Sequence, residues 1–188
     1  MATQRQVKKA KTVRKAAAPA KKSAKRAPQV ARAKPSRATT SAAAAGDYEG
    51  VRQVLSRYCF ALDSGNLDEL SLLFHRQADF SVSFENGLKH NGRDTIHSWY
   101  ARFFQERPRQ FHHMRHKLFE PLITISGKTA TTSTYFDSEA KDTSGQIQLI
   151  SGRYDDSLVK EGSQWFFKER TITVLYHYSP GIGQEGMR

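Results

Sequence analysis

The sequence predicts an α+β domain in which helices of the first half pack on a long, curved antiparallel sheet formed by the second half. Two observations lead to this fold class. Apolar residues recur at helical spacing in three segments between residues 51 and 104. Four extended runs then cover about 110–125, 129–139, 145–159 and 163–177, separated by short turns. Helices packed on such a sheet can enclose an internal pocket.

The first expected helix ends at an aspartate on its own apolar face. Asp63 continues that face, and the Ser-Gly-Asn at 64–66 is typical of a helix stop. Burial and the negative end of the helix dipole both disfavour a charged carboxylate there, which makes Asp63 a candidate general base. The alternative is that Asp63 only caps or turns the chain in solvent. The apolar face consists of Val51, Leu55, Tyr58, Cys59 and Leu62.

Two more helices and a hairpin are expected before the long strands. Asn66 is a suitable cap for a short helix at 67–74. Residues 78–92 predict a hairpin with its turn at Asn86-Gly87. Asp94 is the expected cap of a third helix that runs through Phe104, and Pro108 is expected to end it.

The first long strand carries three histidines. Side chains alternate between the two faces of a strand, so His112, Met114, His116 and Leu118 share one face and Arg115 the other. Because charged residues favour solvent, we expect His112 and His116 to face the interior. A bulge is expected near Pro121. A lone inward histidine is usually a satisfied core residue, but a core-facing aspartate in the same domain makes His116 a candidate partner for it.

Charge divides the chain of 188 residues into two parts. Residues 1–46 hold thirteen Lys or Arg, no Asp or Glu and no aromatic residue, whereas the remainder holds seventeen basic and eighteen acidic side chains. The net charge of +12 therefore belongs to the first segment. This composition predicts a disordered tail at 1–46 and a folded domain at 47–188.

The tail is a candidate for nonspecific binding to DNA, RNA or another polyanion, or to an anionic membrane surface. Its phrase AAAPAKKSAKRAP resembles the tails of linker histones in composition. The alternative is a solubilising extension without a partner. The candidate nucleic-acid contacts are Lys8, Lys9, Lys11, Arg14, Lys15, Lys21, Lys22, Lys25 and Arg26.

Cysteine content and hydropathy limit the location. Cys59 is the only cysteine, so the chain can form neither an intrachain disulfide nor a cysteine-based metal site. No apolar run approaches the length of a signal-peptide core or a membrane span. We therefore expect a cytoplasmic protein, associated with the nucleoid if the tail binds DNA.

Three segments resemble the SnoaL-like branch of the nuclear-transport-factor-2-like superfamily. They read RYCFALDSGNLDEL at 57–70, FHHMRHKLFEPLITISGKTATTSTYF at 111–136, and GRYDDSLVKEGSQWFFKERTI at 152–172. The resemblance spans about 47–178. It implies a cone-shaped barrel, in which a strongly curved antiparallel sheet is wrapped by three helices around a hydrophobic pocket. The branch includes scytalone dehydratase, bile-acid 7α-dehydratase, a hexachlorocyclohexane dehydrochlorinase and polyketide cyclases.

The resemblance also implies a set of site residues. In the eliminating members, an aspartate that ends the first helix and a histidine on the first long strand form a catalytic pair, and Asp63 and His116 match them. Tyr58 matches a tyrosine five residues before that aspartate. Metal-ligand spacings are absent, and the family chemistry implies no cofactor. The residues expected to line the pocket are His112, Met114, Tyr135, Asp137 and His177.

These observations favour a cofactor-independent lyase or isomerase that acts on a hydrophobic cyclic or polyketide-like molecule. The aspartate would fix the imidazole tautomer, the other ring nitrogen would remove a proton, and Tyr58 would donate to a leaving hydroxyl or an enolate oxygen. One alternative is a noncatalytic ligand-binding or subunit-assembly domain, like the small subunits of aromatic-ring dioxygenases. Another is a nucleic-acid-associated factor that acts through its tail. The resemblance implies a homodimer or larger assembly.

Overall fold

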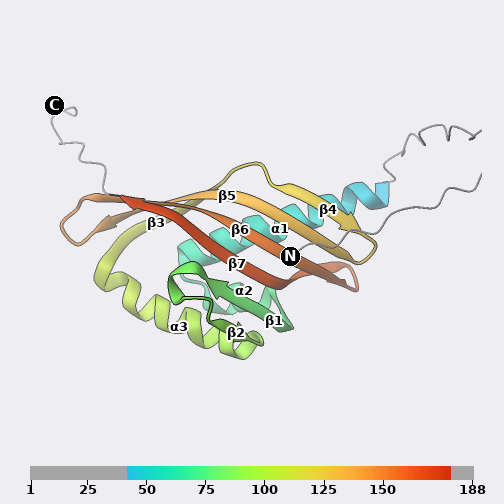
Figure 1. The fold of residues 1–188 in the computed structure, drawn as a ribbon, viewed down its shortest axis with the longest axis horizontal. Helices are drawn as coiled ribbons and strands as arrows, with labels where there is room; N and C mark the ends of the chain where they lie inside the picture. Colours follow the sequence, from blue (N-terminus) through green and yellow to red (C-terminus); the bar gives the residue numbers. More distant parts are fainter. Residues whose placement is uncertain (1–41, 179–188) are drawn as a thin grey trace, which may run out of the picture. The chain divides into compact units, whose positions relative to one another are not determined.

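The computed structural model describes residues 42–178 of the protein, which form helices and one large sheet (Figure 1). The helices are α1 (Ala42–Ser64), α2 (Leu67–Leu72), the 3₁₀ turn η1 (Ser83–Glu85) and α3 (Arg93–Gln110). The strands are β1 (Phe74–Val82), β2 (Lys89–Asn91), β3 (Phe111–Leu118), β4 (Leu122–Ser126), β5 (Thr129–Asp142), β6 (Ile147–Glu161) and β7 (Gln164–Tyr178).

The seven strands form a sheet in the order β2-β1-β7-β6-β5-β3, and β4 also pairs with β5. The predicted α+β fold class is confirmed. Within the described residues the sheet stays open, with β2 and β3 at its two ends, so it does not close into a barrel. The pairs are antiparallel except that β1 joins β7 in parallel. The extended run expected at 110–125 is two strands, interrupted between Leu118 and Leu122.

The ends of α1 and α2 follow the sequence signals, whereas both ends of α3 differ from the prediction. Gly65 adopts a left-handed φ of 73°, and the N–H of Asn66 donates to Ala61 O at 2.9 Å, which completes the predicted stop of α1. Asn66 caps α2, as predicted, by accepting from the N–H of Glu69. The prediction that Pro108 ends the third helix is wrong. Pro108 lies in the last turn of α3, where the missing proline N–H costs only one hydrogen bond.

The expected cap of α3 also differs in the structure. Gly92 is the N-cap residue, and Asp94 lies in the first helical turn. An acid there still favours the positive end of the helix dipole, but it does not hold the cap position.

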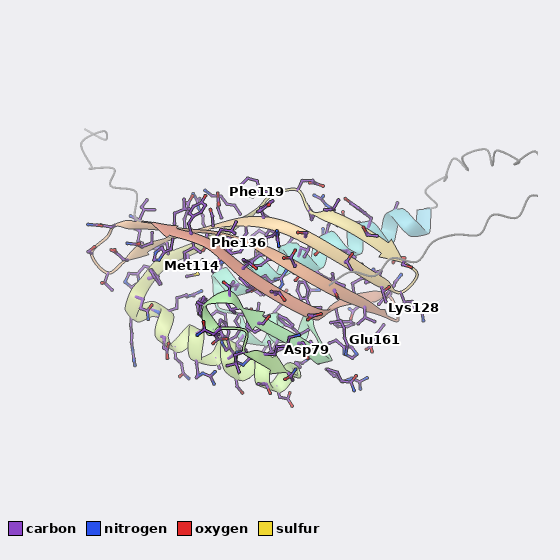
Figure 2. All side chains as sticks on the ribbon, in the orientation of Figure 1. Asp79, Met114, Phe119, Lys128, Phe136 and Glu161 are labelled. Atoms are coloured by element: carbon purple, nitrogen blue, oxygen red, sulfur yellow. The ribbon has the colours of Figure 1, made fainter. Side chains whose placement is uncertain are left out.

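The core lies between α1, α3 and one face of the sheet, which we call the inner face because it carries the buried side chains Phe136 and Tyr154. Alternate residues of β5 and β6 are buried, and the residues between them lie on the opposite, outer face. Figure 2 shows the side chains that project from the sheet and the helices. Tyr58 of α1 is buried among aromatic rings from β1, α3, β6 and β7, so α1 is fixed to the sheet by aromatic packing.

A glycine on β6 allows one of these rings to lie flat. A Cβ atom at Gly152 would come within 2.5 Å of the Thr173 carbonyl oxygen and 2.6 Å of the Phe136 ring. Without that atom, Phe136 covers Gly152 and stacks on Tyr154, with 4.1 Å between ring centroids. Phe136 is thereby placed with its centroid 6.0 Å from the imidazole of His116.

Candidate active site

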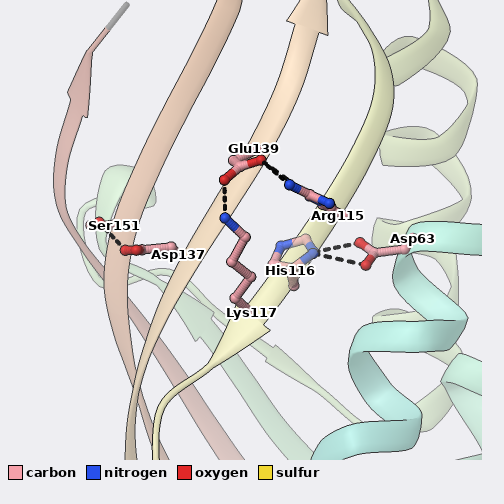
Figure 3. A network of polar contacts seen from close by, with 7 residues as sticks. All are labelled: Asp63, Arg115, His116, Lys117, Asp137, Glu139 and Ser151. Carbon is pink, nitrogen blue, oxygen red and sulfur yellow. Dashed lines mark hydrogen bonds and ion pairs between the residues drawn. The ribbon is translucent and has the colours of Figure 1, made fainter. Parts of the chain in front are cut away.

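Asp63 and His116 form two hydrogen bonds with each other (Figure 3). The backbone N–H of His116 donates to Asp63 Oδ2 at 2.8 Å, and His116 Nδ1 lies 2.6 Å from Asp63 Oδ1. The side chains retain 7% and 20% of their exposure for His116 and Asp63 respectively. The two residues are therefore mostly buried but not sealed from solvent.

The contact arises because a helix end meets an edge strand. β3 ends the path of the sheet, and His116 pairs with Ser138 on β5, so its N–H points to the open side of the strand. The carboxylate at the C-terminal end of α1 accepts that N–H. Because a carboxylate only accepts, Nδ1 carries the hydrogen and Nε2 of the neutral ring holds a lone pair. This arrangement orients a base.

Arg107, in the last turn of α3, adds a positive charge beside the pair. Its Nη1 donates to the carbonyl oxygen of Leu62 at 2.7 Å, at the end of α1 where carbonyl groups lack helical partners. Burial lowers the pKa of Arg107, and the nearby carboxylate of Asp63 opposes that shift. The guanidinium thus offsets both the helix dipole and the charge of Asp63.

Tyr58 is hydrogen-bonded to another tyrosine and not to Asp63 or His116. It is 1% exposed, and its hydroxyl lies 2.7 Å from the hydroxyl of Tyr100, where one of the two groups donates to the other. Ring contacts connect Tyr58 through Tyr154 and Phe136 to His116. Burial raises the pKa of Tyr58 to about 12, and the positive charge of Arg170 opposes part of this shift. Tyr58 therefore remains a neutral phenol over the usual pH range.

The expectation that His112 faces the interior is wrong. His112 pairs with Lys141, which lies on the outer face, whereas His116 pairs with Ser138 on the inner face. An extra residue interrupts the alternation, because His113 adopts a left-handed φ of 54° and the register shifts between His112 and Arg115. The bulge lies near the start of β3, and His112 is exposed on the outer face.

Tyr135 and Asp137 also lie on the outer face, contrary to the expectation that they line an internal pocket. Both alternate with the buried inner residues of β5; Tyr135 is 55% exposed, and Asp137 accepts from the hydroxyl of Ser151. Figure 3 shows that Glu139 accepts from Arg115 and Lys117 on this same side. These charges belong to the outer surface.

Met114 and His177 lie on the inner face, but His177 is exposed and neither residue lines one of the two pockets described below. Met114 is half-buried and alternates with His116 on β3, and Figure 2 labels it. Ile150 on β6 pairs with both Ser138 and His177, which puts His177 in the same cross-strand row as His116. Three strand spacings of about 4.8 Å separate the two histidines, so they are roughly 14 Å apart. The Nε2 of His177 is hydrogen-bonded to Gln148 at 3.1 Å.

Arg170 and Asp156 form a buried ion pair next to the ring of Tyr58, and the sequence analysis did not predict it. Arg170 is 0% exposed and donates to both carboxylate oxygens of Asp156, from Nε at 2.7 Å and from Nη2 at 2.9 Å. Its guanidinium carbon lies 3.8 Å from the ring centroid of Tyr58. Within residues 42–178, Arg170 Nη1 and Thr134 Oγ1 are the buried side-chain polar atoms without a hydrogen-bond partner.

Two pockets occur elsewhere in the domain. One, of about 400 Å³, lies on the outer face and includes Thr131, Ser133 and Asp155. The other, of about 520 Å³, lies between α1 and the start of β7 and includes Val54 and Trp165. Neither is lined by Asp63 or His116.

Residues 42–178 contain no group of three or more His, Cys, Asp or Glu side chains arranged to hold a metal ion. Their helices include none that is both long and apolar enough to cross a bilayer. The candidate tail residues from Lys8 to Arg26 lie outside the described residues.

Solved structures share this fold. A protein of Novosphingobium aromaticivorans with a provisional assignment as scytalone dehydratase superposes with a TM-score of 0.62 at 20% identity, covering 73% of this chain and 89% of its own. A hexachlorocyclohexane dehydrochlorinase from Novosphingobium barchaimii gives a TM-score of 0.63 at 15% identity, covering 73% and 93%. A nuclear-transport-factor-2-like protein from Salmonella enterica gives 0.60 at 19%, covering 76% and 99%. At these identities the likeness shows the fold.

The family follows from the sequence itself. No curated protein matches it significantly. The family model described as "SnoaL-like domain" matches residues 43–171, which is more than half of the chain. The protein therefore belongs to the SnoaL-like family, as the resemblance predicted.

Proposed function

We propose that the protein is a cofactor-independent lyase or isomerase that acts on a hydrophobic cyclic or polyketide-like molecule. The observation that carries this proposal is the doubly hydrogen-bonded contact between Asp63 and His116. The carboxylate holds Nδ1–H, leaves Nε2 as a base and stabilises the imidazolium that forms when Nε2 takes a proton. A dehydrochlorinase among the structures of similar fold supports the assignment to elimination chemistry.

Elimination by Asp63 and His116 needs no oxidant or reductant, because only a proton, an electron pair and a leaving group move. Nε2 of His116 removes a proton from a carbon next to an activating carbonyl or similar group. The electron pair of that C–H bond forms a C=C bond, and the bond to a neighbouring hydroxyl or halide breaks. A leaving hydroxide takes the proton that the imidazolium carries and departs as water; when halide leaves as the anion, the imidazolium returns its proton to solvent. In an isomerisation, the imidazolium instead returns the proton to a different carbon.

Tyr58 is the proposed proton or hydrogen-bond donor. Burial raises its pKa to about 12, so its hydroxyl hydrogen is retained at neutral pH. Its hydroxyl contacts Tyr100, and a substrate oxygen would have to share or replace that contact. Tyr58→Phe should therefore lower turnover less than a change at His116, because the base survives in that variant.

The proposed reaction can be tested by following the exchange of carbon-bound hydrogen in candidate substrates. The full chain is incubated in D₂O with a panel of cyclic enones and of hydroxylated or halogenated ring compounds. Mass spectrometry then reads deuterium uptake and the loss of water or hydrogen halide. On a substrate found in this way, His116→Ala and Asp63→Asn should each lower the rate by about 100-fold or more, since a positioned base contributes about 10²–10⁴.

Lys117→Ala is the matched control. Lys117 follows His116 on β3 but lies on the outer face with Glu139, so its loss should leave turnover within about twofold of the parent. Parent-level turnover in both His116→Ala and Asp63→Asn would refute the assignment. Saturable ligand binding in the parent, with no exchange or turnover on the panel, would favour a noncatalytic binding domain.

The pair also has a structural role that must be separated from catalysis. Asn at position 63 can still accept the backbone N–H of His116, but its amide group no longer dictates the imidazole tautomer. Asp63→Asn should therefore lose activity while its thermal unfolding stays close to that of the parent. Equal losses of activity and of folded protein would instead favour a purely structural contact.

We also propose that segment 1–46 binds nucleic acid or another polyanion without sequence preference. The support is its charge, since it holds thirteen basic and no acidic side chains. Affinity for duplex DNA should fall steeply with salt, because counterions are released on binding. Gel shifts should compare the full chain with a chain that begins at Ser41, which leaves α1 intact. Equal DNA affinity of the two chains would refute this role.

A further inference from the structure

The pocket between the first half of α1 and the start of β7, which we call the α1–β7 pocket, has the size and lining of a ligand site. Its volume is about 520 Å³, and pockets for small molecules range from about 300 to 1,000 Å³. Two arginines line it and no acidic residue does. The residues that define the pocket here are Val54, Arg57, Leu73, Arg93 and Trp165.

Each of the two arginines is held through its Nε, so its two terminal nitrogens can donate hydrogen bonds to a ligand. Nε of Arg93 donates to the carbonyl oxygen of Phe74 at 2.8 Å, and Nε of Arg57 donates to Glu69 at 3.2 Å. Among residues 42–178, the terminal nitrogens of these two guanidinium groups make no hydrogen bond to protein. Planar guanidinium groups bind carboxylates through paired N–H donors, so both present donors that suit an anion.

The floor of the pocket is apolar and close-packed, and the neutral polar residues Ser163 and Gln164 complete its lining at the exposed side. Val54, Leu73 and Trp165 are 5%, 3% and 4% exposed, and together they give the pocket a hydrophobic floor. The indole N–H of Trp165 donates to Asp47 at 3.2 Å, which satisfies the polar edge of that ring. A Cβ atom at Gly50 would come within 2.9 Å of the Trp165 ring, so glycine lets α1 approach the ring closely.

We propose that the α1–β7 pocket is a second small-molecule site, and that it binds a carboxylate carried on an apolar chain or ring. The apolar body would lie on Trp165, Val54 and Leu73, and the carboxylate would accept from Arg57 and Arg93. The lining holds two cations and no acid, and although Glu69 pairs with Nε of Arg57, the terminal nitrogens of both arginines remain for an anion. The buried floor favours an apolar body over a free inorganic ion. The site is independent of the Asp63–His116 pair, which does not line it.

Octanoate is a suitable probe, and octanamide is its neutral counterpart of the same length. In a Trp99→Phe chain, Trp165 is the only tryptophan left of the two. Its fluorescence should change saturably as octanoate is added and respond at least about tenfold more weakly to octanamide, because the charge-assisted hydrogen bonds are lost. Calorimetry on the unmodified full chain gives the same affinities without the substitution.

Arginine variants locate the site. Arg93→Gln and Arg57→Gln should each weaken octanoate binding, and the double variant should abolish saturation. Arg109→Gln, an exposed arginine in the last turn of α3, is the matched control and should bind as the parent does. Circular dichroism of each variant checks that the fold is retained. Leu73→Gln should also weaken binding, through the apolar floor.

The outcomes separate this inference from the proposed reaction. Asp63→Asn should leave octanoate binding unchanged, so failure of the elimination assay leaves this test intact. Octanoate binding that survives the Arg57→Gln and Arg93→Gln double substitution would overturn the proposal. So would equal affinities for octanoate and octanamide, or a linear, unsaturable response of Trp165.

Discussion

Asp156 accepts hydrogen bonds from Arg170 through both of its carboxylate oxygens. This ion pair lies in the interior of the domain, where the side chains of both residues are 0% exposed. The guanidinium is stacked against Tyr58, Phe167 and Tyr154, with its central carbon 3.8 to 4.3 Å from the three ring centroids. A cation is thus held within the aromatic core that fixes α1 to the sheet, and its only acidic partner among the described residues is Asp156.

Asp156→Asn should destabilise the domain strongly. Removing one partner of a buried ion pair leaves an uncompensated charge and typically costs about 3–5 kcal/mol. Urea unfolding followed by circular dichroism measures the free energy of unfolding. Asp155→Asn is the control, because Asp155 pairs with Arg153 at the surface and should cost at most about 1 kcal/mol. Equal losses in the two variants would contradict the argument.

Alkaline pH should unfold the protein in part through Tyr58. Burial raises the pKa of this group from 10.0 to about 12 in the folded chain. The folded state therefore holds its proton more tightly, so the stabilisation is complete below pH 10 and is lost as the pH rises toward 12. Tyr58→Phe should flatten the fall of unfolding free energy in that window, whereas Tyr135→Phe, on the outer surface, should not.

Acidic pH should act through Glu139. Hydrogen bonds from Lys117 and then Arg115 lower the pKa of this carboxyl below its usual 4.5. Its stabilisation is therefore present above pH 4.5 and is lost as the pH falls through the lower folded-state value. Glu139→Gln should reduce the acid dependence of unfolding free energy, and Glu106→Gln, on the exposed side of α3, serves as the comparison. An unchanged acid profile in Glu139→Gln would argue against these contacts.

Cys59 should resist alkylation until the chain unfolds. Burial raises the pKa of its thiol to about 12, and reactivity depends on the thiolate. Iodoacetamide labelling followed by mass spectrometry should be slow in buffer and fast in concentrated urea. Rapid labelling in buffer would mean that α1 opens readily.

Local patterns were enough to find Asp63 and His116. The helix stop after Ser64 places Asp63 at the end of α1, and strand alternation near His116 places its imidazole on the inner face. His112 was misplaced because one extra residue at His113 reverses the alternation, whereas the bulge was expected near Pro121. The error thus comes from counting residues across an irregular strand.

The contacts of Arg170 and Arg107 were not predicted from the sequence, for a different reason. A bulge between Phe167 and Glu169 turns Arg170 inward, where strict alternation from Phe167 would turn it to the outer face. Asp156 could have indicated the ion pair, because it alternates with buried residues on β6 and a buried carboxylate requires a cationic partner. Arg107 reaches the end of α1 from another helix, and no local pattern encodes that contact.

The Asp63 carboxylate contacts both the backbone and the imidazole of His116, which limits the substitutions that position 63 can accept. The same two oxygens fasten the last strand of the sheet path to a helix and aim a ring nitrogen. Selection on either property therefore acts on the other, and a library randomised at position 63 should lose heat tolerance and turnover together in most of its members. Suppressor substitutions that reattach β3 by another route should restore heat tolerance alone.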